Sequence, residues 1–430
     1  MLGSALVYLA ACGKPLKPPS LAAPSPRALP VVEEAFSSAI HAETGEPTVR
    51  IQKSALEKEF LLQGYLIDQP IMAVGNPIRS RVVVFKRRGN RLYLLEANHG
   101  HSVTFDLPQN FVLAEFSLTK ETPEALEFDF NAGMSAIFKA KDWASPDFER
   151  RQYETAFSFY RLKLSYLEEV KTLPHDKLIV RQVGQIEVID DKKNYRYLPV
   201  EVRYYLTPYQ VSPSFKKAPV GNFKEVGFFE TPAQLKTDGS HEVFSIKFDE
   251  SKPILFAISA NTPPEFRDAV RDGILYWKPL LPSIDVKMGP EGITAPDFEH
   301  NIVQWVANDE AGTASAHSQI QPRTGEVLHS QVYLPSAFAF GSRSRVRSLM
   351  RRWEVQNRPS PINAHGLLRG FGATSLCELE GGELKRALGD LISTKAGDAT
   401  LLRVAQDYIR ATVAHEIGHT IGLRHNFAGS

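Results

Sequence analysis

Residues 415–425 constrain the fold of this chain more than any other segment. They read His-Glu-Ile-Gly-His-Thr-Ile-Gly-Leu-Arg-His. The preceding run is apolar at helical spacing, at Leu402, Ala405, Ile409 and Val413. If this run is a helix, His415 and His419 lie one turn apart, so that both imidazoles project from the same face. The sequence therefore predicts a long, buried helix whose last turns carry two histidines.

The residues that follow predict a sharp turn and a metal site. Gly422 has no Cβ and adopts positive φ easily, so it can end the helix and reverse the chain. His425 then returns toward His415 and His419. Three neutral imidazoles are typical of a catalytic Zn²⁺ site, in which water takes the fourth position. Glu416 is placed to take a proton from that water, and we expect one catalytic zinc ion.

The alternative is a buried helix whose histidines only hydrogen-bond their neighbours. With 12 histidines and 28 glycines in 430 residues, the five-position pattern should arise by chance in well under about one such chain in a thousand. The metal site is therefore the favoured interpretation of this segment.

The rest of the chain predicts an α+β fold. An antiparallel, β-rich domain is expected over residues 31–245, where β-branched and aromatic runs flank turn signals such as Gly89-Asn90. A second domain is expected over residues 246–430. Its predicted elements are a strand at 253–258, a helix at 263–278, strands at 284–288 and 302–306, a hairpin, and the long helix.

The hairpin of the second domain turns at residues 322–325, and its second arm alternates in polarity. In residues 327–334, His329, Gln331 and Tyr333 share one face, while the opposite face is mostly apolar. This alternation predicts a half-buried strand at the edge of a sheet.

Composition excludes several classes of function. Fifty basic and forty-nine acidic side chains leave a formal charge of +1, which argues against nucleic-acid binding. No run approaches the ~20 apolar residues of a membrane-spanning helix. Two cysteines cannot build a disulfide framework.

The N-terminal residues predict export. Leu9-Ala10-Ala11-Cys12 resembles the lipobox of bacterial lipoproteins, in which the cysteine after the cleavage site carries lipid. Residues 13–30 contain six prolines and predict an extended spacer, so residues 1–30 are interpreted as a signal remnant and linker. No Lys or Arg precedes Cys12, and we expect the true start upstream. The expected location is the periplasm, or the outer membrane through lipidated Cys12.

The histidine motif is the signature of the metzincin zinc peptidases, and most of the chain resembles bacterial EcxA-type Met-zincin lipoproteins. The segments that support this are Val226–Phe229, Lys252–Ile254, the helix with Trp277, and Pro322–Glu326. The resemblance implies that the second domain is a metzincin-like catalytic unit with a mixed sheet and an active-site helix. It implies zinc binding by His415, His419 and His425, with Glu416 as general base and acid. It also implies that the strand at 327–334 aligns an extended peptide.

One feature departs from the family. Metzincins place a methionine beneath the zinc, downstream of the third histidine, and the five residues after His425 contain none. We therefore expect this sequence to be part of a longer protein, cut after the zinc motif.

The function that these observations favour is a zinc-dependent metalloendopeptidase with a protein or peptide substrate. Two alternatives remain open. One is a non-catalytic, partner-binding β module attached to an incomplete peptidase unit. The other is a zinc hydrolase that acts on a different amide, such as peptidoglycan. Cleavage specificity, oligomeric state and the role of residues 31–245 do not follow from the sequence.

Overall fold

The structure is a computed structural model, and its described residues belong to a unit that begins at residue 34. Among these residues, no helix is both long enough and apolar enough to cross a membrane. The described residues are 34–67, 76–97, 112–138, 159–189, 195–220, 227–231, 234–235, 241–293, 300–307, 314–341 and 398–425.

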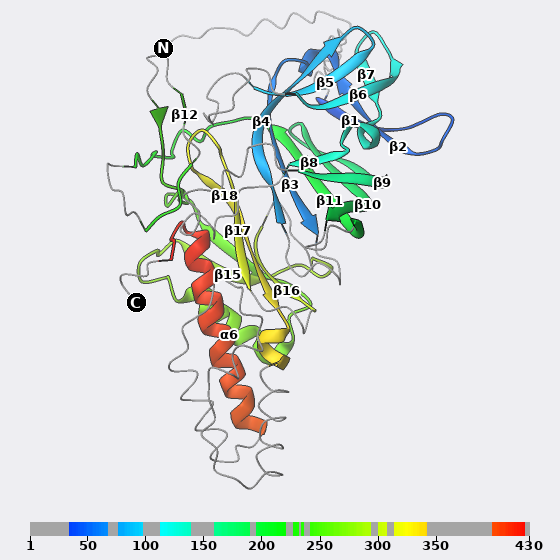
Figure 1. Cartoon of the computed structure of the whole chain (residues 1–430). Helices are drawn as coiled ribbons and strands as arrows, with labels where there is room; N and C mark the ends of the chain where they lie inside the picture. Colours follow the sequence, from blue (N-terminus) through cyan, green and yellow to red (C-terminus); the bar gives the residue numbers. More distant parts are fainter. Residues whose placement is uncertain are drawn as a thin grey trace, which may run out of the picture. The chain divides into compact units, whose positions relative to one another are not determined.

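The first half of the unit is a large antiparallel sheet (Figure 1). Its strand order is β1-β2-β7-β6-β5-β4-β3-β11-β10-β9-β8, and every neighbouring pair is antiparallel. The strands are β1 (Phe36–Ile40), β2 (Pro47–Gln52), β3 (Glu59–Ile67), β4 (Asn76–Arg88), β5 (Arg91–Glu96), β6 (Val112–Glu121), β7 (Ala125–Phe128), β8 (Ala136–Phe138), β9 (Phe159–Leu173), β10 (Lys177–Ile189) and β11 (Tyr195–Pro208). Two short helices join them, η1 (Lys53–Ala55) and α1 (Phe130–Gly133).

Local turn chemistry and a shared core explain this sheet. β4 and β5 meet at Gly89, whose φ of 58° fits the tight hairpin turn that the sequence predicts. The sheet curls, so that β1 and β2 contact β9. As a result one apolar core contains residues from most of its strands, among them Phe36, Phe85 and Val180. The predicted antiparallel region is therefore present.

The second half holds a five-stranded mixed sheet of order β15-β14-β16-β18-β17. The first four strands in this order are parallel, and β17 runs antiparallel to β18. The strands are β14 (Ile254–Ile258), β15 (Ile284–Met288), β16 (Asn301–Val306), β17 (Ser315–Ile320) and β18 (Val327–Pro335). A two-stranded pair, β12 (Gln234–Leu235) and β13 (His241–Glu242), precedes it, and a helical turn, η2 (Ala337–Gly341), follows β18.

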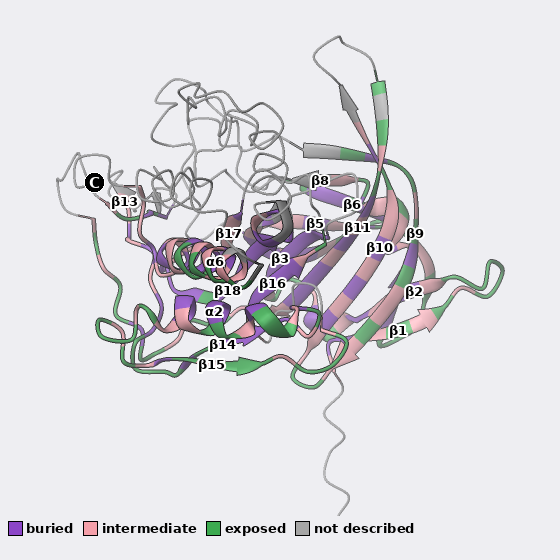
Figure 2. Ribbon diagram, turned by 90° about the horizontal axis from the view of Figure 1, so that it is seen from below, coloured by how far each residue is buried: buried purple, intermediate pink, exposed green. Residues whose placement is uncertain are grey.

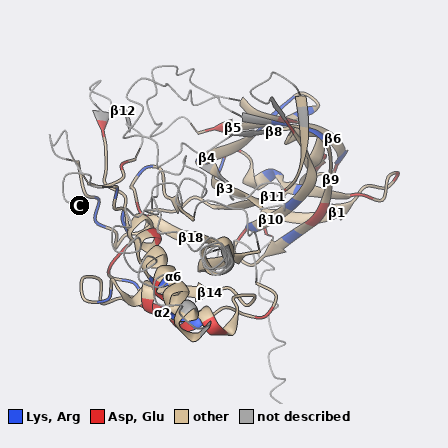
Figure 3. Cartoon of the chain, turned by 60° about the horizontal axis from the view of Figure 1, so that its bottom comes forward, with Lys and Arg blue, Asp and Glu red and all other residues tan. Residues whose placement is uncertain are grey.

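Two helices pack on one face of the mixed sheet, α2 (Pro264–Leu275) and α6 (Asp398–Thr420). The buried side of α2 includes Phe266, Val270 and Ile274, each 0% exposed. Its outer side carries the charged residues that Figure 3 shows along this helix, including the ion pair of Arg271 with Asp268. The α+β class is therefore as predicted.

The other face of the mixed sheet packs against the large sheet. The hydroxyl of Tyr65 in β3 lies 2.7 Å from Nε2 of His329 in β18, and Gln319 in β17 donates to the Gly64 carbonyl at 3.0 Å. Figure 2 shows buried residues along β3, β16 and β18. The mixed sheet is therefore covered on both faces at β17 and β18.

This packing corrects the prediction of an edge strand at 327–334. β18 pairs with β16 on one side and with β17 on the other, so it is an interior strand. His329, Gln331 and Tyr333 are 3%, 0% and 1% exposed. Their polar face does not meet solvent, because it lies against the large sheet. Among the described strands, β17 is the one at this edge.

The predicted domain boundary near residue 245 falls between the sheets. The large sheet ends at Pro208, and the mixed sheet begins at Ile254. Whether these regions are independent domains stays a prediction. Cys12 and the rest of residues 1–30 lie outside the described residues.

Candidate metal centre

Helix α6 carries the site because one of its faces is apolar. Ala405, Ile409, Val413 and Ile417 recur at four-residue spacing and are 0–1% exposed. They pack in one core with α2 and the mixed sheet. Burying a Val or Ile side chain stabilises a fold by about 1.5–3 kcal/mol, so this stripe fixes which way the rest of α6 faces.

A close contact with α2 sets the height and rotation of α6. The two helices meet at Gly273, where a Cβ would lie 2.7 Å from the carbonyl oxygen of Arg410. Just beyond α2, the indole Nε1 of Trp277 donates to the carbonyl oxygen of Ala414 at 2.7 Å. The same ring lies against Gly418, where a Cβ would be 3.0 Å away. The contacts at Ala414 and Gly418 lie on either side of His415 along α6.

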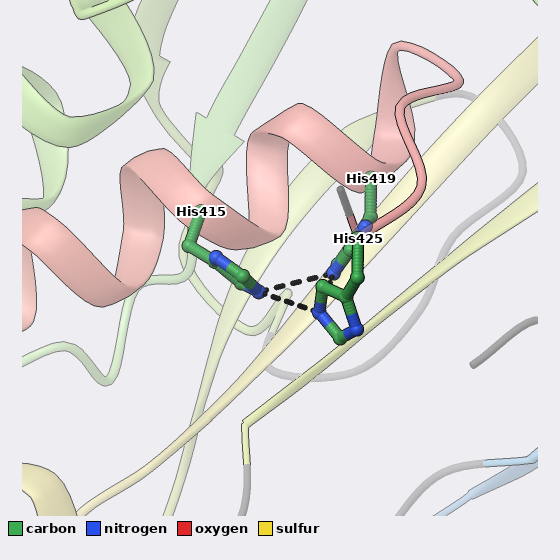
Figure 4. A group of neighbouring side chains, drawn as sticks. All are labelled: His415, His419 and His425. Atoms are coloured by element: carbon green, nitrogen blue, oxygen red, sulfur yellow. Dashed lines mark hydrogen bonds between the residues drawn. The ribbon is translucent and has the colours of Figure 1, made fainter. Parts of the chain in front are cut away.

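Three imidazoles converge beside the end of α6. His415 and His419 project from the last turns of the helix, and His425 comes from the chain beyond it (Figure 4). The three Nε2 atoms are 3.1 Å apart in every pairing. Two nitrogen atoms that bind one tetrahedral zinc ion at about 2.0–2.1 Å lie about 3.3 Å apart. The three nitrogens are therefore spaced as ligands of a single ion, and this group can hold a metal.

The turn that returns His425 is of the kind predicted at Gly422. Helix α6 ends at Thr420, and Gly422 has a φ of 105°. The amide of Leu423 donates to Gly418 and the amide of Gly422 donates to His419, both at 3.0 Å, which is the bonding pattern of a Schellman motif. A Cβ on Gly422 would lie 2.2 Å from the carbonyl oxygen of Ile246. Only glycine fits here, for both conformation and space.

A backbone carbonyl fixes the proton of one histidine. Nδ1 of His419 lies 2.8 Å from the carbonyl oxygen of Leu423. Because a carbonyl oxygen only accepts, Nδ1 must donate, and the lone pair of a neutral ring is then on Nε2. Nε2 is the atom that faces His415 and His425, so this hydrogen bond selects the tautomer that binds metal.

The environment keeps the imidazoles neutral. Burial, together with the nearby His419 and His425, lowers the pKa of His415 to about 3. Burial lowers the pKa of His419 to about 4 and also lowers that of His425. At neutral pH each of the three rings is therefore uncharged and has one nitrogen lone pair available for a metal ion.

Glu416 is buried next to the first of these ligands. Its side chain is 1% exposed, and its Oε2 atom has no hydrogen-bond partner among the residues that the structure describes. Burial raises the pKa of this carboxyl to about 8. A buried carboxyl oxygen without a partner is costly, and a bound water or cation would remove that cost. The donor set and this carboxyl together fit a zinc ion with an open position.

The structure brings three predicted residues together: His415, His419 and His425. Glu416 follows His415 on α6, and Gly422 lies in the turn that precedes His425. It places His329, Gln331 and Tyr333 elsewhere, in the layer between the two sheets. Cys12 is not among the described residues.

Two neighbours of the site were not assigned a role from the sequence. The ring of Phe229 lies 5.9 Å from that of His419, and Trp277 bonds Ala414. Phe229 belongs to the segment Val226–Phe229, which supports the resemblance to Met-zincin lipoproteins, but no local pattern places its ring at the metal site. Its contact links residues 190 positions apart, which no periodicity can signal.

Comparison with known proteins agrees with this site. A family model described as Met-zincin matches residues 398–430, which span α6 and the three histidines. No curated protein and no solved structure matches the chain. Residues 398–430 are therefore a metzincin-like region, and the match and the histidine cluster together indicate a zinc metallopeptidase type of domain.

Proposed function

We propose that this protein is a zinc-dependent endopeptidase whose general base is Glu416. The observation that carries the proposal is the buried carboxyl of Glu416, whose Oε2 has no partner among the described residues. It belongs to the residue next to His415, whose Nε2 lies 3.1 Å from those of His419 and His425. A site that only stored or structurally bound metal would not need that carboxyl.

His415, His419 and His425 would hold a zinc ion, which would supply a Lewis acid able to polarise a carbonyl and to acidify water. Glu416 accepts a proton from the attacking water at Oε2 and later donates it to the departing amine nitrogen. Burial raises the pKa of this carboxyl to about 8, which strengthens its affinity for that proton. The positive charge of a zinc ion held by the histidines would favour the ionised form of Glu416 before the reaction begins.

The substrate would lie along β17 (Ser315–Ile320). Among the described strands, β17 has a hydrogen-bonded neighbour on one side only, and it contacts α6. Ser318 in β17 donates to the carbonyl of Thr420, at the end of α6, at 3.4 Å. An extended peptide can add to such an edge by backbone pairing, which would bring its carbonyl groups past the histidines.

The test is to replace Glu416 by Gln in the full-length protein. We expect Glu416→Gln to retain about one zinc ion per chain, by elemental analysis, and to lose peptide hydrolysis by about 10²-fold or more. The matched control is Asp407→Asn on the exposed side of the same helix, which should retain both zinc and activity. A chelator should abolish the activity of the unmodified protein, and added zinc should restore it.

Two substrates should be compared in this assay, an unfolded protein and a cross-linked peptidoglycan peptide. Cleavage of the unfolded protein supports the endopeptidase. Cleavage of the peptidoglycan peptide alone would mean that the same zinc chemistry acts on a different amide. Hydrolysis by Glu416→Gln at the unmodified rate would overturn the role of Glu416.

We also propose that the chain is exported and tethered to a membrane by lipid on Cys12. The proposal rests on the sequence Leu9-Ala10-Ala11-Cys12 and the proline-rich residues 13–30. Mass spectrometry of the mature N-terminus should find an acylated Cys12. An unmodified amine on another residue would contradict it.

A further inference from the structure

The turn that carries His425 is held from outside α6. The amides of Gly422 and Leu423 still donate to carbonyls of α6, whereas the amide of Arg424 donates outside the helix. The direction of this turn decides where the third imidazole lies. The amide of Arg424 donates to the carbonyl of Gly227 at 2.8 Å, and the amide of Phe229 donates to the carbonyl of Gly422 at 2.7 Å. These two bonds flank an antiparallel bridge between Phe228 and Leu423.

The segment that makes these bonds is itself anchored on its other side. We call residues 227–231 the positioning strand. The amide of Ile246 donates to Phe229 at 2.9 Å, and the amide of Thr231 donates to Phe244 at 2.8 Å. Lys247 then continues the pairing to the β17–β18 hairpin, because its amide donates to Gly325 at 3.1 Å. The metal-binding turn is therefore bonded, through two short extended segments, to the mixed sheet.

The side chains of the positioning strand alternate across it. Phe229 is 7% exposed and belongs to the same core as α6, with its ring 5.9 Å from that of His419. Phe228 is 45% exposed. One phenylalanine thus packs against a ligand, and its neighbour on the opposite side does not.

The bridge between Phe228 and Leu423 also helps to fix the tautomer of His419. The carbonyl that accepts from Nδ1 of His419 belongs to Leu423, the residue bridged to Phe228. If the turn moved away, that carbonyl would move with it, and the His419 ring would lose the partner that places its lone pair on Nε2.

We propose that residues 227–231 position the metal ligands: their backbone holds the 422–424 turn, and Phe229 supports the ring of His419. The proposal rests on the zinc site of the proposed function. Phe229 acts through His419 and touches no reacting atom, so it is a positioning residue. A segment that precedes the mixed sheet by more than twenty residues is thereby part of the metal centre.

The experiment compares Phe229 with an exposed aromatic residue of the large sheet, Tyr166 in β9, which is 49% exposed. Both variants are made in the full-length protein. Zinc affinity is measured by competition with a chelator, and the ligand geometry by the visible absorption of the Co²⁺-substituted protein. Phe229→Ala should bind zinc about 10–100-fold more weakly, the range found when partners of metal ligands are removed, and should change the Co²⁺ spectrum. Phe229→Leu should recover part of the affinity. Tyr166→Ala should match the unmodified protein in both measurements.

A core variant separates positioning from general loss of stability. Phe85 lies in the core of the large sheet. Phe85→Leu should lower the unfolding temperature without changing zinc affinity or the Co²⁺ spectrum. If Phe229→Ala folds and binds zinc as tightly as the unmodified protein, with an unchanged spectrum, the proposal is wrong.

A measurement on the unmodified protein covers the case in which Phe229→Ala does not fold. In the zinc-loaded protein the amides of Phe229 and Arg424 should resist hydrogen exchange, because each donates across the pairing. Rapid exchange at both would overturn the proposal. These measurements do not depend on turnover, so a protein that binds zinc but hydrolyses no peptide would refute the proposed function and leave this inference standing.

Discussion

Trp277 donates its indole proton to the carbonyl oxygen of Ala414 at 2.7 Å, one residue before the first of the three converging histidines. The contact joins the end of α2 to the turn of α6 that begins the metal centre. It shows how a helix far from the histidines in sequence determines where they lie, and it gives the first of four tests.

Trp277→Phe should destabilise the fold by about 0.5–1.5 kcal/mol, because it keeps an aromatic ring and removes one hydrogen bond. Urea unfolding followed by circular dichroism measures this. Tyr276→Phe is the matched control, since Tyr276 is 67% exposed, and it should change the free energy of unfolding by less than about 0.5 kcal/mol. Equal effects at both positions would contradict a role for the bond to Ala414.

Gly273→Ala should destabilise the fold although alanine favours helices. In an exposed helix the exchange is worth about 1 kcal/mol in favour of alanine. Here the new Cβ would lie 2.7 Å from the Arg410 carbonyl oxygen and 2.8 Å from Cβ of Val413, and overpacking of this kind costs about 1–3 kcal/mol. Thermal unfolding measures the net loss. Asp268→Ala on the exposed side of α2 should be nearly neutral, and a gain in stability for Gly273→Ala would show that the helices are not in contact.

Asp249 should make stability depend on pH. Hydrogen bonds from Ser214 and Ser251 and the nearby Lys252 hold the pKa of its carboxyl below its usual range. The native state therefore favours the ionised carboxylate. Its contribution is fully present above the unfolded-state pKa of about 3.9, and it is lost as the pH falls toward the lower pKa of the folded state.

Asp249→Asn should accordingly cost about 1–3 kcal/mol at pH 7. The difference from the unmodified protein should shrink by about 1 kcal/mol at pH 3. Urea unfolding at the two pH values measures both quantities, with the exposed Glu250→Gln as control. A difference that stays constant or grows at pH 3 would contradict the assignment.

Arg323 should couple the turn of the β17–β18 hairpin to the large sheet. Its guanidinium donates two hydrogen bonds to the carboxylate of Glu59, at 2.8 and 2.9 Å, and lies over the ring of Tyr209. A double-mutant cycle of Arg323→Gln with Glu59→Gln should give a coupling energy of about 1–2 kcal/mol, because the pair is bidentate and partly buried.

The control cycle uses the exposed pair Lys86 and Glu57, whose charged atoms are 3.5 Å apart. Its coupling energy should be below about 0.5 kcal/mol. Equal coupling energies in the two cycles would mean that the bidentate contact with Glu59 adds nothing to the attachment of the hairpin.

Local patterns predicted the elements of this fold well. The periodicity of Ala405, Ile409 and Val413 predicted α6, and the spacing of His415, His419 and His425 predicted their convergence. Gly89 and Gly422 both adopt positive φ at the turns expected of them. Each of these features depends on residues within about one helical turn or one hairpin, where sequence spacing determines spatial neighbours.

The prediction that β18 is an edge strand was wrong because it depends on contacts between segments far apart in the sequence. Alternating polar residues at His329, Gln331 and Tyr333 indicated a face in water. In the structure that face is buried, and Tyr65 meets His329 at 2.7 Å. A polar side chain can be satisfied by solvent or by another buried polar group, and the pattern is the same in both cases. Strand order likewise depends on which distant strands pair.

The sequence alone determined the helix, its turn and three histidines able to share one metal ion, because these depend on contacts between near neighbours in the chain. Only the tertiary structure decided that β17 is an edge strand, that the large sheet covers β18, and that the ring of Phe229 lies near that of His419. Those features come from the burial of apolar and polar groups between segments far apart in the sequence, and no local spacing encodes such partners.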